Sequence, residues 1–217
     1  MSDQGAFSHG NDFGLIETLL WTPQEGFWLL DEHLARLGAS CAALGFVCDE
    51  ERVHASLAGL AESAAPRLRA RIVVSRDGAI AAGATPIEAT PPDTEWRLAL
   101  ARRRFDSADP MLRHKTTRRA LYEDELAEAQ AREQADEVLF LNERSEVCEA
   151  ARCSVFVARD DHLATPPLAC GLLPGTLRAS LLASGRARET VLRLEDVSGD
   201  GVFLGNSVRG LVRARMI

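Results

Sequence analysis

Arg113-His114-Lys115-Thr116-Thr117-Arg118-Arg119 contains the single lysine of this 217-residue sequence, and arginine occupies every other basic position. A lysine amine can lose its proton, attack a carbonyl and form an imine, whereas a guanidinium stays protonated. Lys115 is therefore a candidate nucleophile for Schiff-base chemistry. The positive charges around it should lower its pKa and leave a neutral fraction of the amine. An arginine- and alanine-rich proteome could also leave one lysine by chance, so the count alone leaves both interpretations open.

The same stretch belongs to a basic segment in an otherwise acidic chain. The formal net charge is −7, which disfavours nucleic-acid binding as the function of the whole chain. The segment contains Arg102, Arg103, Arg104, Arg113, Lys115, Arg118 and Arg119. It is either a solvated helix face or a local site for a phosphate or carboxylate.

The composition is that of an ordinary soluble globular protein, with 46% hydrophobic and 26% charged residues. The length allows one large domain or two small ones. No apolar run is long enough to span a bilayer, and residues 1–10 show no signal-peptide pattern. We therefore expect no membrane partner and no nucleic-acid partner.

Cysteine usage and motif content argue against a metal site. The five cysteines are an odd number and contain no Cys-x-x-Cys pair, so a disulfide framework or zinc ribbon is disfavoured. Reduced thiols in a cytoplasm fit this pattern best. The sequence also lacks His-Glu-x-x-His, a Walker loop and Gly-x-Gly-x-x-Gly, and we therefore predict neither a metal nor a nucleotide site.

Hydrophobic periodicity predicts interspersed helices and strands, and hence an α/β (α+β) fold. We expect helices at residues 31–45, 49–63, 116–134 and 176–185. We expect strands at residues 15–20, 27–30, 68–74, 96–101, 137–141, 145–149, 154–158, 190–194 and 202–204. Residues 83–93 contain three prolines and are predicted to be a loop, and the pattern changes near residues 105–110, where we place a domain boundary.

Two glycine-bounded turns carry clusters of hydrogen-bond donors. Gly171–Arg178 opens a predicted helix, whose free N–H groups and dipole can bind an anion, although many helices begin with Pro-Gly. Gly205–Gly210 is a second such turn, or simply the end of a strand. Its spacing differs from the Gly-x-Ser-x-Gly elbow of hydrolases.

Three further polar residues are candidates for a site. Glu149 ends an apolar strand, where a carboxylate needs a cationic partner. That partner is either an arginine such as Arg152 or the pyridinium nitrogen of a cofactor. Arg36 is either a surface residue or a ligand, and His33 beside it is interpreted as a capping or packing residue.

Taken in chain order, five segments resemble the class IV aminotransferases, which are the fold-type IV pyridoxal-phosphate enzymes. The segments are residues 30–37, 114–117, 146–149, 171–178 and 206–210. The match covers nearly the whole chain and keeps the order of the family. Each segment alone is a weak signal, whereas the combination is specific.

The resemblance implies a small N-terminal α/β domain at residues 1–107, shortened relative to the family, and a C-terminal pseudo-barrel domain at residues 108–217. It also implies pyridoxal 5′-phosphate between the domains, and a homodimer. By this resemblance Lys115 carries the internal aldimine and moves the α-proton, and Glu149 keeps the pyridine nitrogen protonated. The residues expected to bind the cofactor phosphate are Arg36, Thr176, Leu177 and Ser207. Asn206 is expected to be a further cofactor-binding residue.

Within the family, residues 114–122 look most like the 4-amino-4-deoxychorismate lyase branch, whose members release pyruvate and leave 4-aminobenzoate, a folate precursor. The same lysine serves transamination, so an aminotransferase acting on branched-chain or D-amino acids with 2-oxoglutarate is the second hypothesis. A non-catalytic binding module is the third, and the presence of Lys115 and Glu149 argues against it. Arg104, Arg113 and Arg118 are candidates for binding a substrate carboxylate.

Overall fold

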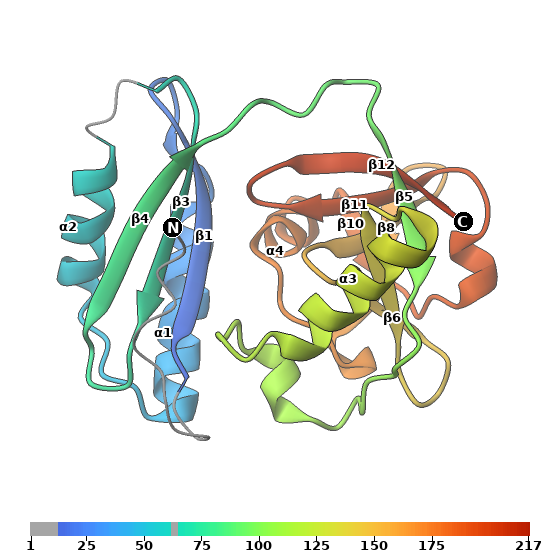
Figure 1. Ribbon diagram of the computed structural model, residues 1–217, viewed down its shortest axis with the longest axis horizontal. Helices are drawn as coiled ribbons and strands as arrows, with labels where there is room; N and C mark the ends of the chain where they lie inside the picture. The colour runs from blue at the N-terminus through green and yellow to red at the C-terminus, as the bar shows by residue number, and fades with distance from the viewer. Residues whose placement is uncertain (1–12, 62–64) are drawn as a thin grey trace.

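The computed structural model describes residues 13–61 and 65–217, which form two β-sheets flanked by helices (Figure 1). The first sheet is antiparallel, with strand order β2-β1-β3-β4. Its strands are β1 (Leu15–Thr22), β2 (Gly26–Phe27), β3 (Leu68–Val74) and β4 (Ile80–Pro86). Helices α1 (Leu30–Leu44) and α2 (Glu50–Leu60) pack against it.

Residue alternation explains the core of this first half. In β3, Leu68, Ala70, Ile72 and Val74 are buried, whereas the arginines between them are exposed. Ala70, Ile72 and Val74 pack with apolar residues from both helices. Nearly every residue of β1 is buried, so this strand is covered on both faces. An acidic residue within β1 must therefore find a partner inside the protein.

The second sheet has eight strands in the order β10-β9-β8-β11-β12-β5-β6-β7 and curls around its own core (Figure 1). Its strands are β5 (Glu95–Leu100), β6 (Glu137–Leu141), β7 (Val147–Ala150), β8 (Ser154–Ala158), β9 (Leu163–Thr165), β10 (Ala187–Glu189), β11 (Val202–Asn206) and β12 (Gly210–Met216). The associated helices are α3 (Ala120–Glu133) and α4 (Thr176–Ala183), with 3₁₀ turns at Pro110–Arg113, Leu168–Cys170 and Leu194–Val197.

This mixture of helices and sheets confirms the predicted fold class. In the described part of the chain, no helix has the length and apolar character needed to cross a membrane. Strand β5 pairs in parallel with β12 and β6, so the chain passes from the first sheet to the second between Pro86 and Glu95. A boundary drawn by sheet membership would therefore precede the predicted one near residue 107. The division into two domains stays a prediction.

Several predicted elements differ in the structure. The predicted strand at residues 190–194 is absent, because residues 190–193 belong to no helix or strand and Leu194 begins a 3₁₀ turn. The predicted strand at residues 27–30 is reduced to β2, because α1 begins at Leu30.

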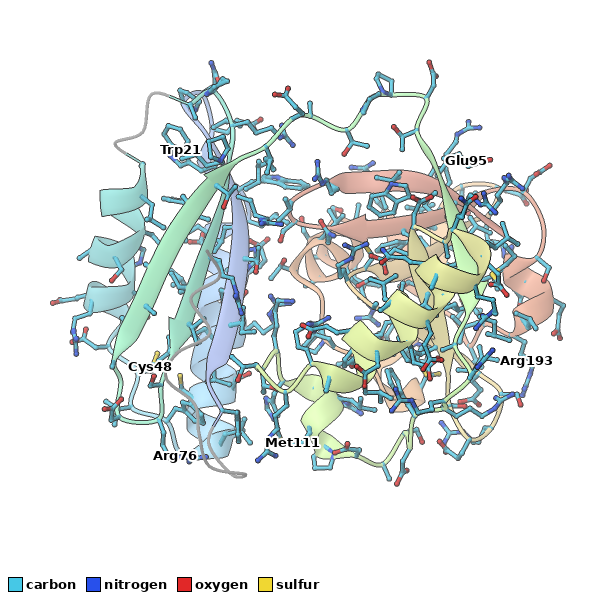
Figure 2. The ribbon with its side chains drawn as sticks, viewed as in Figure 1. Trp21, Cys48, Arg76, Glu95, Met111 and Arg193 are labelled. Atoms are coloured by element: carbon cyan, nitrogen blue, oxygen red, sulfur yellow. The ribbon has the colours of Figure 1, made fainter. Side chains whose placement is uncertain are left out.

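Strand β4 occupies the first residues of the predicted 83–93 loop, because it completes a hairpin with β3. Helix α3 begins at Ala120 and not at Thr116, because Thr116 forms an isolated bridge with Leu15 of the first sheet. The two halves also share core packing, since Met111 contacts the apolar cluster of the first sheet (Figure 2).

Candidate active site

Lys115 lies where the two halves of the chain meet. Its carbonyl oxygen accepts a hydrogen bond from the Ile16 N–H at 2.8 Å. Two residues further on, the Thr117 N–H donates to the Gly14 carbonyl at 2.9 Å, and the Thr117 hydroxyl accepts from the Gly14 N–H at 3.0 Å. The backbone around Lys115 is thus fixed against the beginning of β1.

The environment of Lys115 favours the neutral amine. Burial, followed by the positive charges of Arg119 and Arg36, lowers the pKa of the Lys115 amine from 10.5 to about 7. The negative charges of Glu17 and Glu149 act in the opposite direction. Taken as a whole residue, Lys115 is partly buried. An amine that is partly neutral near pH 7 can act as a nucleophile or carry a proton.

Glu149 is a buried carboxylate on β7. The Tyr122 hydroxyl donates to its Oε1 at 2.8 Å, and the Leu173 N–H donates to its Oε2 at 3.2 Å. Burial raises the pKa of Glu149 to about 7, while these two hydrogen bonds act in the opposite direction. The alternative partner, Arg152, pairs with Glu137 at 2.5 Å instead. Glu149 is therefore left to interact with a group inside the site.

Arg36 is held by Glu17 of β1, which is only 2% exposed. The Arg36 Nε and Nη2 donate to the two Glu17 oxygens at 2.9 and 2.5 Å, and its Nη1 donates to the Pro174 carbonyl at 3.2 Å. The Nδ1 of His33 lies 2.5 Å from the same carboxylate. Although burial opposes it, the positive charge of Arg36 and these hydrogen bonds lower the pKa of Glu17 to about 2.

The start of α4 presents unpaired donors next to Arg36. Gly175 is the N-cap, and a Cβ there would lie 2.5 Å from the Ser154 Oγ, so a larger residue would displace that hydroxyl. The N–H groups of Thr176 and Leu177 have no acceptor among residues 13–61 and 65–217, although both residues are buried. Buried donors without partners are rare, and at a helix start they can bind an anion.

The turn between β11 and β12 brings a hydroxyl to the same place. The Asn206 Oδ1 accepts from the N–H groups of Val208 and Arg209, both at 2.9 Å, and so shapes the turn. This turn places the Ser207 hydroxyl 2.9 Å from the His33 Nε2. The Thr176 hydroxyl lies 3.3 Å from the same ring nitrogen. Two of the predicted phosphate-binding residues, Ser207 and Thr176, therefore meet at one nitrogen of His33.

The three arginines predicted to bind substrate lie in different surroundings. The Arg104 guanidinium donates to the Asn142 carbonyl at 3.0 Å and to the Ser145 hydroxyl at 3.2 Å. The Arg118 guanidinium lies 4.4 Å from the centre of the Phe13 ring. Arg113 has a buried Nε without a hydrogen-bond partner in the described part of the chain.

Several residues that line the candidate site are not singled out by the sequence. The sequence pattern does not single out Glu17, Arg119 or Tyr122 for these roles, and it gives His33 only a capping or packing role. Two signals are nevertheless present: Glu17 interrupts an apolar strand in the same way as Glu149, and Tyr122 is the only tyrosine of the chain.

Comparisons with known proteins identify the family. The sequence model of amino-transferase class IV matches residues 14–217, and the chain belongs to this family. It is 29% identical over 209 residues to a Schizosaccharomyces pombe protein provisionally named an aminodeoxychorismate lyase, covering 94% of this chain and 89% of the relative.

Two solved structures define the similarity further. A Mesorhizobium loti protein, provisionally named an amino-acid aminotransferase, is 45% identical, with a TM-score of 0.89 and coverage of 95% of this chain and 100% of that chain. The pyridoxal-phosphate-bound form of a hypothetical aminotransferase from Mycobacterium tuberculosis is 24% identical, with a TM-score of 0.79. The match covers 100% of this chain and 87% of that chain. This last match concerns the fold alone.

Class IV aminotransferases depend on pyridoxal phosphate, which is therefore the cofactor of this chain. The residues present fit this group. Unpaired buried N–H groups, a guanidinium and hydroxyls can bind its phosphate. A partly neutral amine and a buried carboxylate can meet its aldehyde and its ring nitrogen. The chain is an enzyme of this class.

Proposed function

We propose that Lys115 is the catalytic amine of this enzyme and that the reaction is cleavage of 4-amino-4-deoxychorismate to 4-aminobenzoate and pyruvate. The observation that carries the catalytic assignment is that the only lysine lies close enough to Glu149 of β7 and to Arg36 of α1 for both charges to act on its amine. The amine in that position has a pKa of about 7.

Lys115 and Glu149 act on different parts of the bound cofactor and substrate. When bound, pyridoxal phosphate supplies an aldehyde and a conjugated ring that stabilises negative charge on the substrate carbon. Lys115 takes a proton from that carbon and can return it, because its amine titrates near neutral pH. Glu149 stabilises a proton on the ring nitrogen, and Tyr122 and Leu173 fix the direction of its carboxylate.

The phosphate group is bound, in this proposal, by donors from three separate elements. Arg36 of α1 supplies positive charge, and the N–H groups of Thr176 and Leu177 supply unpaired donors at the start of α4. Ser207 adds a hydroxyl, and Asn206 shapes the turn that carries it. Because these elements come from both halves of the chain, binding requires the halves to be docked.

The lyase assignment is supported by the Schizosaccharomyces pombe relative and by the resemblance of residues 114–122 to that branch. In this reaction, proton removal at the substrate carbon is followed by loss of a leaving group, and no amino acceptor is consumed. The Mesorhizobium loti structure, at 45% identity, favours a second candidate, an aminotransferase acting on amino acids. Lys115 serves both reactions, so the substrate decides between them.

One pair of incubations separates the two candidates. The full chain with pyridoxal phosphate is supplied with 4-amino-4-deoxychorismate alone, or with an amino acid and 2-oxoglutarate. We expect 4-aminobenzoate and pyruvate in equal amounts in the first incubation and no glutamate in the second. Glutamate formation without cleavage would instead identify the aminotransferase. Lys115→Ala is the control, and neither product should form with it.

Further proposals follow the family resemblance. Arg113 and Arg118 bind a substrate carboxylate, supported for Arg113 by a buried Nε that has no partner within the described residues. We propose the same carboxylate-binding role for Arg104, whose guanidinium is bonded to the turn at residues 142–145 in the structure. We also propose a homodimer, a cytoplasmic location, a role in folate precursor synthesis and the division into two domains.

A further inference from the structure

Glu17 bonds both Arg36 and His33, and the other side of the His33 ring contacts the hydroxyls of the proposed phosphate site. The two Glu17 oxygens accept hydrogen bonds from the Arg36 guanidinium, and one of them also lies 2.5 Å from the His33 Nδ1. The carboxylate is buried and its pKa is lowered to about 2, so it is ionised and can only accept. The His33 Nδ1 must therefore carry a proton.

The other nitrogen of the His33 ring faces the two hydroxyls. In the neutral ring with a protonated Nδ1, the Nε2 has one lone pair and no proton. The Ser207 hydroxyl at 2.9 Å and the Thr176 hydroxyl at 3.3 Å can donate to that lone pair. The Ser207 hydroxyl has a second acceptor, the Thr18 carbonyl at 3.3 Å. Without an anion, all hydroxyl protons can thus be used within the protein.

A bound phosphate changes this arrangement. Its oxygens only accept, so the Ser207 and Thr176 hydroxyls would turn their single protons toward it. The Nε2 of His33 would then face oxygen lone pairs from both hydroxyls, without a proton between them. A proton on Nε2 removes this conflict, because the ring then donates at both nitrogens. The ionised Glu17 balances the charge of the resulting imidazolium.

We propose that Glu17 and His33 are positioning residues of the phosphate site, and that phosphate binding converts the His33 Nε2 from acceptor to donor with uptake of one proton. The inference rests on the proposed function, because it takes the donor cluster at α4 as the phosphate site. Glu17 positions Arg36 and the imidazole together, and the imidazole positions the two hydroxyls. The site is therefore specific for an anionic group whose oxygens accept hydrogen bonds from Arg36 and from the two hydroxyls.

A test of proton uptake at His33 must account for the other charged groups near the ring. Glu17 faces the ring from β1, and Arg36 lies beside it on α1. From α4 and the β11–β12 turn, the groups that contact the ring are the Thr176 and Ser207 hydroxyls. The Arg178 guanidinium of α4 bonds the Pro166 carbonyl and Glu189. Arg209 of the turn bonds the Glu88 carbonyl. Lys115 also loses positive charge near pH 7 and would weaken anion binding as the pH rises. A variant must therefore remove the proposed proton uptake at the His33 Nε2 and keep Lys115.

His33→Gln is that variant. A glutamine amide reaches toward the hydroxyls and can either accept or donate by rotation, without taking up a proton. Binding of sulfate, a dianion that does not titrate near neutral pH, is measured on the full-length protein without cofactor between pH 7.5 and 8.5. A one-proton uptake weakens sulfate binding about tenfold more per pH unit in the wild type than in His33→Gln. Equal slopes would overturn the proposal.

Nuclear magnetic resonance tests the same event without a substitution. In full-length protein with ¹⁵N-labelled histidine, the His33 Nε2 signal should move from the unprotonated to the protonated range when pyridoxal phosphate binds. Pyridoxal, which lacks the phosphate, should leave the signal in the unprotonated range, although it can still react with Lys115. A signal that is unchanged by pyridoxal phosphate, or changed equally by pyridoxal, would overturn the proposal.

The two proposals fail in different ways. If pyridoxal phosphate gives the yellow protein and borohydride attaches it to Lys115 while the His33 signal stays unprotonated, the inference fails and the proposed function stands. If the cofactor never reacts with Lys115, the proposed function fails as well. Glu17→Gln adds a further readout: it should weaken sulfate binding, because a neutral amide no longer fixes both Arg36 and the His33 tautomer.

Discussion

The structure predicts the pKa of the Lys115 amine, and this pKa can be measured directly because the chain has no other lysine. This pKa is lowered from 10.5 to about 7 by burial and by the charges of Arg119 and Arg36. At pH 7 about half of the amine is then neutral, against roughly one molecule in three thousand for an ordinary lysine. The neutral fraction controls the rate of acylation. We therefore expect Lys115 to react near neutral pH far faster than an exposed lysine.

The assay uses the absence of any other lysine. The full-length protein without cofactor is treated briefly with an amine-acylating reagent from pH 5 to pH 11, and the peptide containing Lys115 is quantified by mass spectrometry. The α-amino group of the chain is the internal reference, with an ordinary pKa of about 8. The Lys115 labelling curve should have its midpoint near pH 7, below that of the reference.

A matched pair of variants tests whether a nearby positive charge lowers the Lys115 pKa. Arg119→Gln removes the positive charge with the largest effect on the Lys115 pKa, and the labelling midpoint should move to higher pH. Arg118→Gln removes a neighbouring positive charge whose guanidinium lies over Phe13, and the midpoint should move less. A wild-type midpoint above about pH 9, or equal shifts in the two variants, would refute this account of the site.

Three other predictions concern the groups that support Lys115, and a fourth concerns the start of α4. Glu149→Gln should lower turnover roughly ten- to hundredfold while the bound cofactor's absorbance is kept, because a charged hydrogen bond to the ring is lost. Tyr122→Phe should raise the Glu149 pKa and move the acid limit of activity to higher pH. Glu17 has a folded pKa of about 2, below its unfolded value of 4.5, so it stabilises the fold above pH 4.5 and this contribution is lost as the pH falls toward 2. Other carboxylates also titrate in that window, so the comparison is between variants: in urea unfolding the wild type should lose about 3 kcal/mol more than Glu17→Gln between pH 4.5 and 2. Gly175→Ala should cost about 1–3 kcal/mol, since the added Cβ would lie 2.5 Å from the Ser154 hydroxyl oxygen, and adding Ser154→Ala should restore stability in the same urea assay.

Candidate site residues can be predicted from the sequence when their residue type is itself unusual at that position. Lys115 is the only lysine, and Glu149 interrupts an apolar strand, so residue type and local pattern suffice to single out both as candidates. The role of His33 cannot be found in this way, because it depends on contacts with Ser207 and Thr176, more than 140 positions away. Sequence spacing gives no information about such contacts.

Local structure is likewise easier to predict than pairing. The alternation in β3 and the Pro-Gly start of α4 are local signals, and both predicted elements are present in the structure. The membership of β5 in the second sheet depends on parallel pairing with β6 and β12, which are distant along the chain. Thr116 has helix-like neighbours, but its bridge to Leu15 prevents the helix from starting there.

Covalent attachment of the cofactor tests the central claim most directly. The full-length protein is loaded with pyridoxal phosphate, reduced with borohydride and digested, and the peptides are identified by mass spectrometry. We predict that the cofactor mass is found on the peptide that contains Lys115 and that Lys115→Ala takes up none. A yellow wild-type protein whose Lys115 peptide stays unmodified after reduction would contradict the claim.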